Sequence, residues 1–483
     1  MLQDRVRRLW ILAGLAVASL VVLGVSSAAN PPLAGSLDRS FGTGGIAQSP
    51  DSTSIGGIAL QPDGRIVVAG GSRTALVLAR YLPTGTLDPS FGTGGNVETD
   101  LDPGSSLALA LQPDGKIVVA AGSPYGTSSN RFTLARYDSN GSPDTSFGTD
   151  GSTDTVVPTS LDASWTPWGA GVAALAVLPD GRILAAGSAL WHAGLYEEAG
   201  GFVLTRYTPA GLLDPTFGDG GIVETFGGGA DLAGLVVLPD RKIVATGTID
   251  GGHPNYPTKI AIAGYEPDGS VDFTYPAEAG TFGRLSGGPA ALQHGKIVVA
   301  GSIRHYKQTF PVVARYGADG LLDKTFGRHG YAEFRRTQFA PGAVVTQNDG
   351  KILVAGNSNS GGTVLRLLPN GRLDPSFGGR GFVSLDPGSS SLASQQDGKI
   401  LVGGQTLDRL LGGNNCVVPD LRGKTVSKAA AALVKSYCRH GSVSRRFSGT
   451  VARGRVISTA PGPGTLRPGG TRIHLVVSKG KPR

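Results

Sequence analysis

Short apolar runs separated by glycine, proline and aspartate recur along most of the chain. In one unit, the runs at 152–157, 172–178, 182–187 and 202–207 are rich in aliphatic or β-branched residues. Runs of this length with these boundaries are typical of β-strands. Pro179-Asp180-Gly181 joins the second run to the third and favours a tight hairpin turn. The unit is therefore predicted to be a four-stranded antiparallel meander.

Two signature segments show that this unit is repeated. A segment like Leu87-Asp88-Pro89-Ser90-Phe91-Gly92 recurs with its aspartate at positions 38, 88, 144, 214, 272, 323 and 374. A second segment, like 111–119, recurs with its turn near positions 64, 115, 181, 241, 295, 350 and 398. A lone meander cannot bury both faces, so the copies must stack, and radial stacking of four-stranded units gives a β-propeller. We expect an all-β fold with seven blades of four strands over residues 37–413.

These two segments resemble the delta-60 family of bacterial propeller repeats. The resemblance covers the predicted propeller and implies its fold. It implies no activity, because the family has no general biochemical assignment.

Residues that recur in every copy are interpreted as structural. Asp88, Phe91, Arg80 and Asp114 belong to this class, since a catalytic constellation must be unique whereas a repeated residue serves each blade. The arginine of the last strand in each copy is expected to pair with a loop carboxylate between blades. It occurs at Arg80, Arg136, Arg206, Arg315, Arg366 and Arg409. Gly264 replaces it in the fourth copy, which is therefore expected to be looser.

Function is expected where the copies differ. The variable segments 123–131, 158–170, 188–201, 248–259 and 302–310 fall on one face of the predicted propeller, and aromatic and polar side chains concentrate there. The candidate ligand-binding residues are Trp165, Trp168, Trp191, His192, Tyr196, Glu197, Tyr125, Tyr256 and Tyr306. Exposed aromatic rings suit a sugar or peptide ligand. The alternative is that these rings pack the long insertions onto the blades.

A second candidate site is a polar ring in the central channel. Three residues after the glycine that opens each first strand stand Gln48, Glu98, Asp154, Glu224, Ser286, Glu333 and Ser384. If the first strand is innermost, Glu98, Asp154, Glu224 and Glu333 could hold a cation through their carboxylates. Solvation of a water-filled channel explains the same pattern. The sequence predicts no other cofactor.

Charge divides the chain into two parts. The formal net charge is +8, yet residues 414–483 hold 14 Lys and Arg against the single acid Asp420, which leaves −5 for residues 1–413. An acidic body with a basic tail indicates that the tail is drawn to a polyanion. No nucleic-acid-binding signature accompanies the charge, so a nucleic-acid partner is not expected.

The tail resembles a PASTA domain, an extracellular module of bacterial cell-wall kinases and penicillin-binding proteins. The segments 416–425, 429–433, 454–461 and 469–480 carry the resemblance. From the residues alone, Thr425 is a candidate N-cap for a helix, and Cys416 is expected to form a disulfide with Cys438, which would contribute about 3 kcal/mol. The resemblance implies association with peptidoglycan. Candidate wall-binding residues are Arg445, Arg446, Arg453, Arg455, Lys479 and Lys481. The alternative is a solvated basic surface without a ligand.

The first residues predict export. Arg5, Arg7 and Arg8 precede an uncharged apolar run from Leu9 to Val25 and then small residues, an order typical of a signal peptide spanning 1–29. The alternative is an uncleaved anchor, which would be the chain's one contact with a membrane. The expected protein is secreted or wall-associated and non-catalytic, and binds a cell-wall polymer and a glycan, peptide or protein. No nucleophile or metal-ligand motif is present, which favours the non-catalytic protein. The alternative function is a propeller lyase or hydrolase acting on an extracellular polymer.

Overall fold

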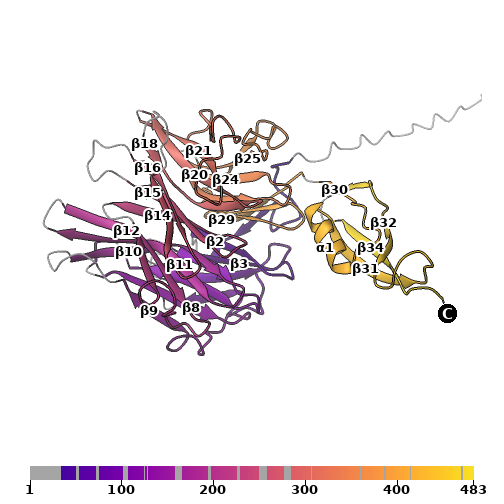
Figure 1. Cartoon of the computed structure of the whole chain (residues 1–483), viewed down its shortest axis with the longest axis horizontal. Helices are drawn as coiled ribbons and strands as arrows, with labels where there is room; N and C mark the ends of the chain where they lie inside the picture. The colour runs from indigo at the N-terminus through magenta and orange to yellow at the C-terminus, as the bar shows by residue number, and fades with distance from the viewer. Residues whose placement is uncertain are drawn as a thin grey trace, which may run out of the picture. The chain divides into compact units, whose positions relative to one another are not determined.

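The computed structural model describes residues 34–482, with gaps at 51–53, 72–74, 100, 102–106, 124–125, 128, 158–165, 194–196, 226–228, 250–257, 277–283, 306, 359–360, 386–387, 414 and 469–470. The predicted signal peptide lies outside the described residues. Apart from the tail, the described residues form seven antiparallel sheets, numbered here sheet 1 to sheet 7 in chain order (Figure 1).

Sheets 1 to 4 are each built from four consecutive strands. Sheet 1 contains β2 (Ser54–Leu60), β3 (Ile66–Gly71), β4 (Leu76–Tyr81) and β5 (Asn96–Thr99). Sheet 2 contains β6 (Leu107–Leu111), β7 (Ile117–Gly122), β8 (Arg131–Tyr137) and β9 (Ser152–Val156). Sheet 3 contains β10 (Thr166–Val177), β11 (Ile183–Ala193), β12 (Glu197–Tyr207) and β13 (Ile222–Thr225). Sheet 4 contains β14 (Ala230–Val237), β15 (Ile243–Ile249), β16 (Lys259–Tyr265) and β17 (Val271–Pro276).

Sheets 5 to 7 vary this plan. Sheet 5 has a divided first strand and contains β18 (Arg284–Ser286), β19 (Ala290–Gln293), β20 (Lys296–His305), β21 (Gln308–Tyr316) and β22 (Tyr331–Glu333). Sheet 6 contains β23 (Ala340–Thr346), β24 (Ile352–Ser358), β25 (Gly361–Leu367) and β26 (Phe382–Leu385). Sheet 7 joins β27 (Ser391–Ser394), β28 (Ile400–Gly403) and β29 (Thr406–Leu410) to β1 (Ile46–Gln48) from the start of the chain.

Each inner strand contacts the inner strand of the next sheet along the chain. The inner strands are β2, β6, β10, β14, β19, β23 and β27, and β27 in turn contacts β2. The backbone amide of Ile55, on β2, donates to the carbonyl of Gly404 in sheet 7 at 2.7 Å. The predicted all-β propeller is therefore the architecture of this region. Between neighbouring sheets lie cores such as the one that packs Leu134 and Phe147 against Val172 and Ile183.

The boundaries of the sequence copies differ from those of the sheets. The strand that opens each copy pairs with the sheet of the preceding copy, as β9 does with β8 and β1 does with β29. The recurring arginine consequently lies on the third strand of its sheet and not on the fourth.

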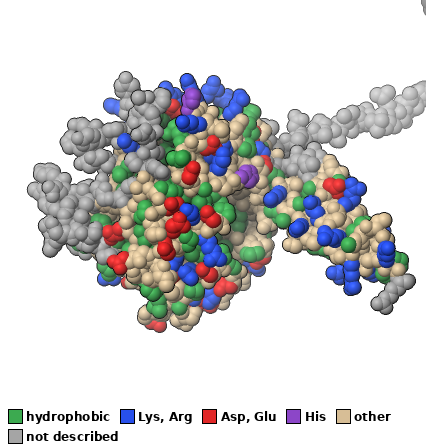
Figure 2. Space-filling view, viewed as in Figure 1, with side chains coloured by type: hydrophobic (Ala, Val, Ile, Leu, Met, Phe, Trp, Pro, Cys, Tyr) green, Lys and Arg blue, Asp and Glu red, His purple; other side chains and the backbone are tan. Residues whose placement is uncertain are grey.

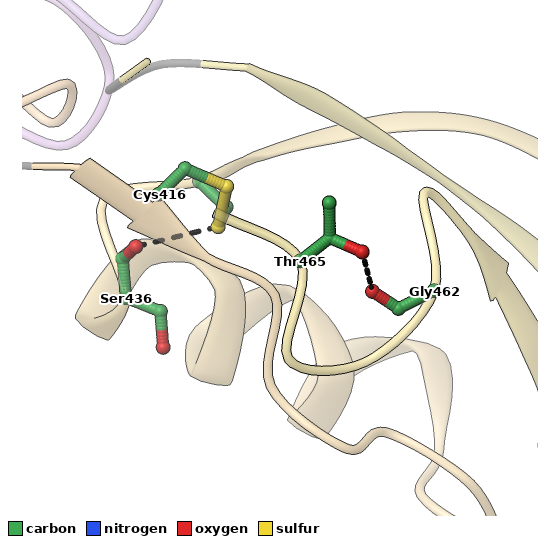
Figure 3. Close-up of a disulfide and its surroundings, with 5 residues drawn as sticks. Cys416, Ser436, Gly462 and Thr465 are labelled. Carbon is green, nitrogen blue, oxygen red and sulfur yellow. Dashed lines mark hydrogen bonds between the residues drawn. A yellow bond between two sulfur atoms is a disulfide. The ribbon is translucent and has the colours of Figure 1, made fainter. Parts of the chain in front are cut away.

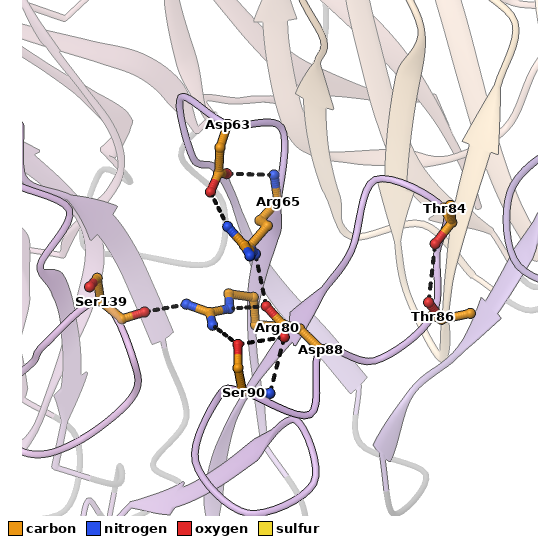
Figure 4. A network of polar contacts seen from close by, with 8 residues as sticks. All are labelled: Asp63, Arg65, Arg80, Thr84, Thr86, Asp88, Ser90 and Ser139. Carbon is orange, nitrogen blue, oxygen red and sulfur yellow. Dashed lines mark hydrogen bonds and ion pairs between the residues drawn. The ribbon is translucent and has the colours of Figure 1, made fainter.

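This arginine joins four groups at once. Arg80 donates through Nε to the Asp88 carboxylate at 2.9 Å and through Nη2 to the Ser90 hydroxyl at 3.0 Å (Figure 4). Its Nη1 donates to the carbonyl of Ser139 in the next sheet, and its guanidinium lies 4.8 Å from the centre of the Phe91 ring. The expected ion pair is thus present, with a carboxylate eight residues away, and the contact to the neighbouring sheet is made to a backbone carbonyl.

A second basic side chain reaches the same aspartate in most copies, and sequence reasoning missed it. It directly follows the last residue of the hairpin turn, which is Arg241 in sheet 4 and glycine in the other pairs; Arg65 in this position forms an ion pair with Asp88 at 2.8 Å. The equivalent pairs are Lys116 with Asp144, Arg182 with Asp214, Lys242 with Asp272, Lys296 with Asp323, and Lys399 with Asp38. Five of the seven aspartates therefore pair with two cations, whereas Asp272 pairs with Lys242 and Asp374 with Arg366.

Residues 415–482 form a separate small sheet-and-helix unit. Its strands are β30 (Asn415–Val417), β31 (Arg439–Arg446), β32 (Val456–Ala460), β33 (Leu466–Pro468) and β34 (Arg472–Ser478), and its helix is α1 (Val426–Lys435). The Thr425 hydroxyl caps α1 by accepting from the Lys428 amide at 3.3 Å, as the sequence predicts. Within the described part of the chain, no helix has the length and hydropathy of a membrane span.

The predicted disulfide between Cys416 and Cys438 is present (Figure 3). It ties β30 to the end of the helical segment, 22 residues further on, and both cysteines are buried beside Leu433 and Ile473. In the nearby turn the Thr465 hydroxyl donates to the Gly462 carbonyl at 2.7 Å. The small core of this unit is thus closed covalently.

Removing a recurring arginine is predicted to destabilise the propeller. Arg366 is 1% exposed, donates to Asp374 at 2.9 Å and lies 4.7 Å from the Phe377 ring centre. Arg366→Ala leaves a buried carboxylate without its partner, which costs about 3–5 kcal/mol. We expect a lower urea midpoint than in the wild type, while the exposed Arg372→Ala in the same sheet should match the wild type. Equal midpoints for the two variants would show that the junction adds no stability.

The Asp38 junction predicts an acid dependence of stability. Burial alone would raise the pKa of Asp38, but hydrogen bonds from Ser40 and Lys399 and the charge of Arg409 lower it from 3.8 to about 2. A carboxylate with a lowered pKa stabilises the fold above its unfolded pKa and loses that contribution as the pH falls through the folded value.

We therefore expect the wild type to exceed Asp38→Asn in urea midpoint by a constant amount from pH 7 to about 5. The difference should shrink between about pH 4 and 2. A difference that persists unchanged at pH 2 would contradict the assignment.

Candidate functional site

The strand topology places the variable connections at one end of the sheets. In an antiparallel meander, alternate connections share an end, so the Pro-Asp-Gly hairpins lie at one end and the variable segments at the other. We call the second end the variable end; its segments are 123–131, 158–170, 188–201, 248–259 and 302–310.

Two of the insertions in sheet 3 lengthen strands. β10, β11 and β12 have 12, 11 and 11 residues, and Trp191 pairs across β11 and β12 with Ala199. The Asn130 side chain joins this extension to sheet 2: its amide nitrogen donates to the Leu190 carbonyl at 3.2 Å and its oxygen accepts from the Gly169 amide at 2.9 Å. Sequence reasoning missed Asn130, which carries no signal beyond its place in an insertion.

The predicted aromatic residues separate into different roles. Trp191 is 5% exposed and belongs to the core between sheets 2 and 3, so the packing alternative applies to this ring and a ligand contact does not. Trp168 is 40% exposed, and its ring lies edge-on to His192 with centroids 4.5 Å apart. His192 Nε2 is also 3.1 Å from the Thr166 hydroxyl. Trp168 and His192 therefore form a small exposed aromatic platform.

The other candidates on this end stay predictions. Trp165, Tyr125, Tyr196, Tyr256 and Tyr306 lie outside the described residues, and Glu197 is described only as part of β12.

The predicted carboxylate ring in the channel is wrong. Glu98, Asp154, Glu224 and Glu333 lie on β5, β9, β13 and β22, which are the outer edge strands, as are the strands of Gln48 and Ser384. Only Ser286 is on the inner side of its sheet, on β18. The prediction placed the first strand of each copy innermost, whereas this strand completes the preceding sheet. Among the described residues, no group of three or more His, Cys, Asp or Glu side chains could hold a metal ion.

Glu333 instead belongs to a polar cluster at the variable end of sheet 5. Its Oε1 accepts from Arg335 Nε at 2.7 Å and lies 3.2 Å from His305 Nε2. Arg335 Nη2 lies 3.3 Å from the same imidazole nitrogen. The hydrogen bond and charge of Glu333 raise the pKa of Arg335, so this guanidinium is charged throughout the physiological range.

A pocket of about 770 Å³ adjoins this cluster. His305, Lys307, Gln308, Phe310 and Arg335 line it. A second pocket of about 370 Å³ is also lined by Arg335, together with Phe334, Leu365, Phe382 and others. In Figure 2, lysine, arginine and histidine side chains gather at the top of the view, where Figure 1 labels β18 and β21. Sequence reasoning did not single out Arg335 or Lys307, because neither belongs to a motif.

Known families match both parts of the chain. The profile of the domain of unknown function DUF5122, a β-propeller family, matches residues 61–91, 112–147, 178–217, 295–326 and 347–377, and the PASTA profile matches residues 417–479. The chain carries DUF5122 propeller repeats and a PASTA domain. The DUF5122 profile marks five repeats, so the number seven refers to the sheets and not to this match.

Several solved structures resemble this chain at low identity. They include virginiamycin B lyase from Staphylococcus aureus, with 11% identity over 76% of this chain and 97% of that one and a TM-score of 0.46. An ulvan polysaccharide lyase shows 12% identity over 76% and 95% of the two chains, with a TM-score of 0.43. Sqt1 from Chaetomium thermophilum shows 14% identity over 76% and 98%, with a TM-score of 0.41. Similarities of this size carry no argument about activity.

The PASTA domain presents its basic residues to solvent. Arg445, Arg446, Arg453, Arg455, Lys479 and Lys481 are all exposed. Lys479 lies over the Phe447 ring, 5.3 Å from its centre, and Phe447 itself is 60% exposed. Figure 2 shows basic side chains spread over this domain with few acidic ones. The surface therefore offers many cations and one exposed aromatic face.

Replacing the two described tryptophans of sheet 3 one at a time is predicted to lower stability by different amounts, because one ring is buried and the other is exposed. Trp191→Ala removes a buried ring and should cost about 3–5 kcal/mol. Trp168→Ala removes an exposed ring and should change stability by less than about 1 kcal/mol. Thermal and urea unfolding of both variants measures this. Equal destabilisation would mean that Trp168 is also a core residue.

Proposed function

We propose that this protein is an exported, non-catalytic binding protein that associates with the bacterial cell wall through its PASTA domain. The observation that supports this most is the PASTA match together with its charge: 14 Lys and Arg against one acid in residues 414–483. Cell-wall polymers carry carboxylates and phosphates, which attract such a surface. The disulfide agrees with an extracellular location, where thiols are oxidised.

The propeller would supply a second binding surface. Its repeated polar residues are engaged in junctions between sheets, whereas the variable end holds the Trp168 platform and the sheet 5 pocket. Such a combination suits a glycan, peptide or protein ligand. The PASTA domain would keep the propeller at the wall, close to that ligand.

A specific observation favours a second candidate, an enzyme acting on an extracellular polymer. The Glu333 carboxylate and the His305 imidazole lie 3.2 Å apart beside a pocket, a spacing suited to proton transfer. Incubating the protein with wall polymers and measuring released reducing or unsaturated ends tests it. Release that Glu333→Gln abolishes would favour the enzyme.

The wall proposal predicts a salt-sensitive pull-down on isolated cell walls. In the test variant, Arg445, Arg446, Arg453 and Lys479 are all changed to Glu. We expect its retention to fall at least tenfold at low salt, and that of the wild type to fall as salt screens the charges.

A matched control carries four charge reversals at the hairpin end of the propeller. Lys324, Arg328, Arg372 and Arg380 are exposed there, and changing them to Glu alters the net charge equally. This control should be retained like the wild type. Equal retention of the test variant and the wild type would refute wall association through the PASTA domain.

A further inference from the structure

We propose that the sheet 5 pocket binds the carboxylate of an acidic sugar residue within a glycan. This inference deepens the proposed function, since it rests on the variable end being a glycan-binding surface, and it names the ligand class and the residues. Arg335 and Lys307 would contact the carboxylate, and Gln308 the sugar hydroxyls.

The strand register brings the lining residues to one face of sheet 5. His305 pairs with Gln308 across β20 and β21, and Ile303 pairs with Phe310. Glu333 on β22 pairs with Val312. Paired residues, and residues two apart on one strand, project from the same face of a sheet. Residues of β20 and β21 thus line the pocket, and Glu333 on β22 contacts the lining residues His305 and Arg335.

Glu333 fixes the position of the Arg335 guanidinium and leaves one of its nitrogen donors available to a ligand. Its two oxygens engage Nε and Nη2 of Arg335 at 2.7 and 3.4 Å, while no described residue pairs with Nη1. Lys307 is exposed and takes part in no ion pair among the described residues. The pocket therefore carries two cations against one carboxylate, an excess of positive charge that an anionic ligand can satisfy.

This excess contrasts with the rest of the propeller. Residues 33–413 hold 27 Lys and Arg against 34 Asp and Glu, a net charge of −7. At the other end of the sheets, basic side chains such as Lys116 and Lys296 are tied to the repeat aspartates at 2.6 Å. The excess of cations at the pocket is therefore opposite in sign to the net charge of the propeller.

The shape and lining of the pocket favour a sugar acid over a bare anion. A volume of about 770 Å³ lies within the range of pockets that hold small organic ligands. Phe310 is 6% exposed and lies against the His305 ring, 6.1 Å between centroids, so one wall is apolar. A ligand carboxylate can accept from Arg335 Nη1 and from Lys307, and the apolar face of a pyranose suits the ring wall.

Titration calorimetry of the full chain with tetragalacturonate tests the proposal. The fully methyl-esterified tetramer and inorganic tripolyphosphate serve as the other probes. We expect tetragalacturonate to bind, Arg335→Ala to weaken binding at least tenfold and Lys307→Ala at least threefold. The esterified tetramer should bind at least tenfold more weakly than the acid. Both substituted side chains are exposed, so unchanged thermal unfolding verifies that the variants fold.

Two controls separate this site from other charges. Lys324→Ala removes an exposed cation from the other end of sheet 5 and should leave the affinity within twofold. The variant with four reversed charges in the PASTA domain should do the same. If that variant loses binding while Arg335→Ala retains it, the pocket proposal is overturned and the wall proposal stands.

Three further outcomes of the titrations would overturn the proposal. Equal affinity for acid and ester would overturn carboxylate recognition, and binding of tripolyphosphate alone would assign the cluster to phosphate. No binding of tetragalacturonate to the wild type would overturn the sugar-acid assignment and leave the pull-down on cell walls unaffected.

Discussion

The propeller depends on a guanidinium that is engaged at six of the seven junctions between the described sheets. Arg136, for example, binds an aspartate eight residues away, a nearby hydroxyl and a carbonyl of the next sheet, and covers a phenylalanine ring. A buried charge is tolerated only when it is paired and its hydrogen-bonding groups are satisfied. The same junction closes the structure: Arg409 from the last sheet binds Asp38 at 2.9 Å and the Pro83 carbonyl at 2.7 Å, so both ends of the propeller segment meet in it.

The junction at sheet 4 lacks the recurring arginine and is packed differently. Gly264 stands in the arginine position, and a Cβ added there would lie 2.3 Å from the Phe273 ring. Phe273 follows Asp272 directly, whereas in other copies the phenylalanine comes three residues after the aspartate. The Phe273 ring lies against Gly320, as the recurring phenylalanine rings lie against the equivalent glycines, and Gly264 makes room for it. The sequence suggested a looser sheet, but the missing volume is filled, and Lys242 pairs with Asp272 at 2.8 Å.

Local sequence signals predicted the elements well and their partners less well. Pro179-Asp180-Gly181 forms the expected hairpin, Thr425 caps its helix, and Cys416 bonds to Cys438, because each depends on residues close in sequence or on one possible pairing. The partner of an edge strand is a long-range choice that alternation cannot reveal, so Glu98 and Glu333 were assigned to the wrong side of their sheets. The inward direction of Trp191 also follows from strand pairing in a segment that looked like a loop.

The repeat itself explains why candidate chemistry collects at the variable end. Repeated cations lie at the hairpin end, and most are committed to aspartates: Lys116 to Asp144 and Arg182 to Asp214, for example. A committed side chain cannot bind a ligand without exposing a buried carboxylate, which is costly. Side chains outside the repeat are not needed to neutralise these buried aspartates. Arg335 keeps a free Nη1 while held by Glu333 among the described residues, so its charge is both fixed in place and available. Ligand recognition by this propeller should therefore reside in residues that the repeat does not require.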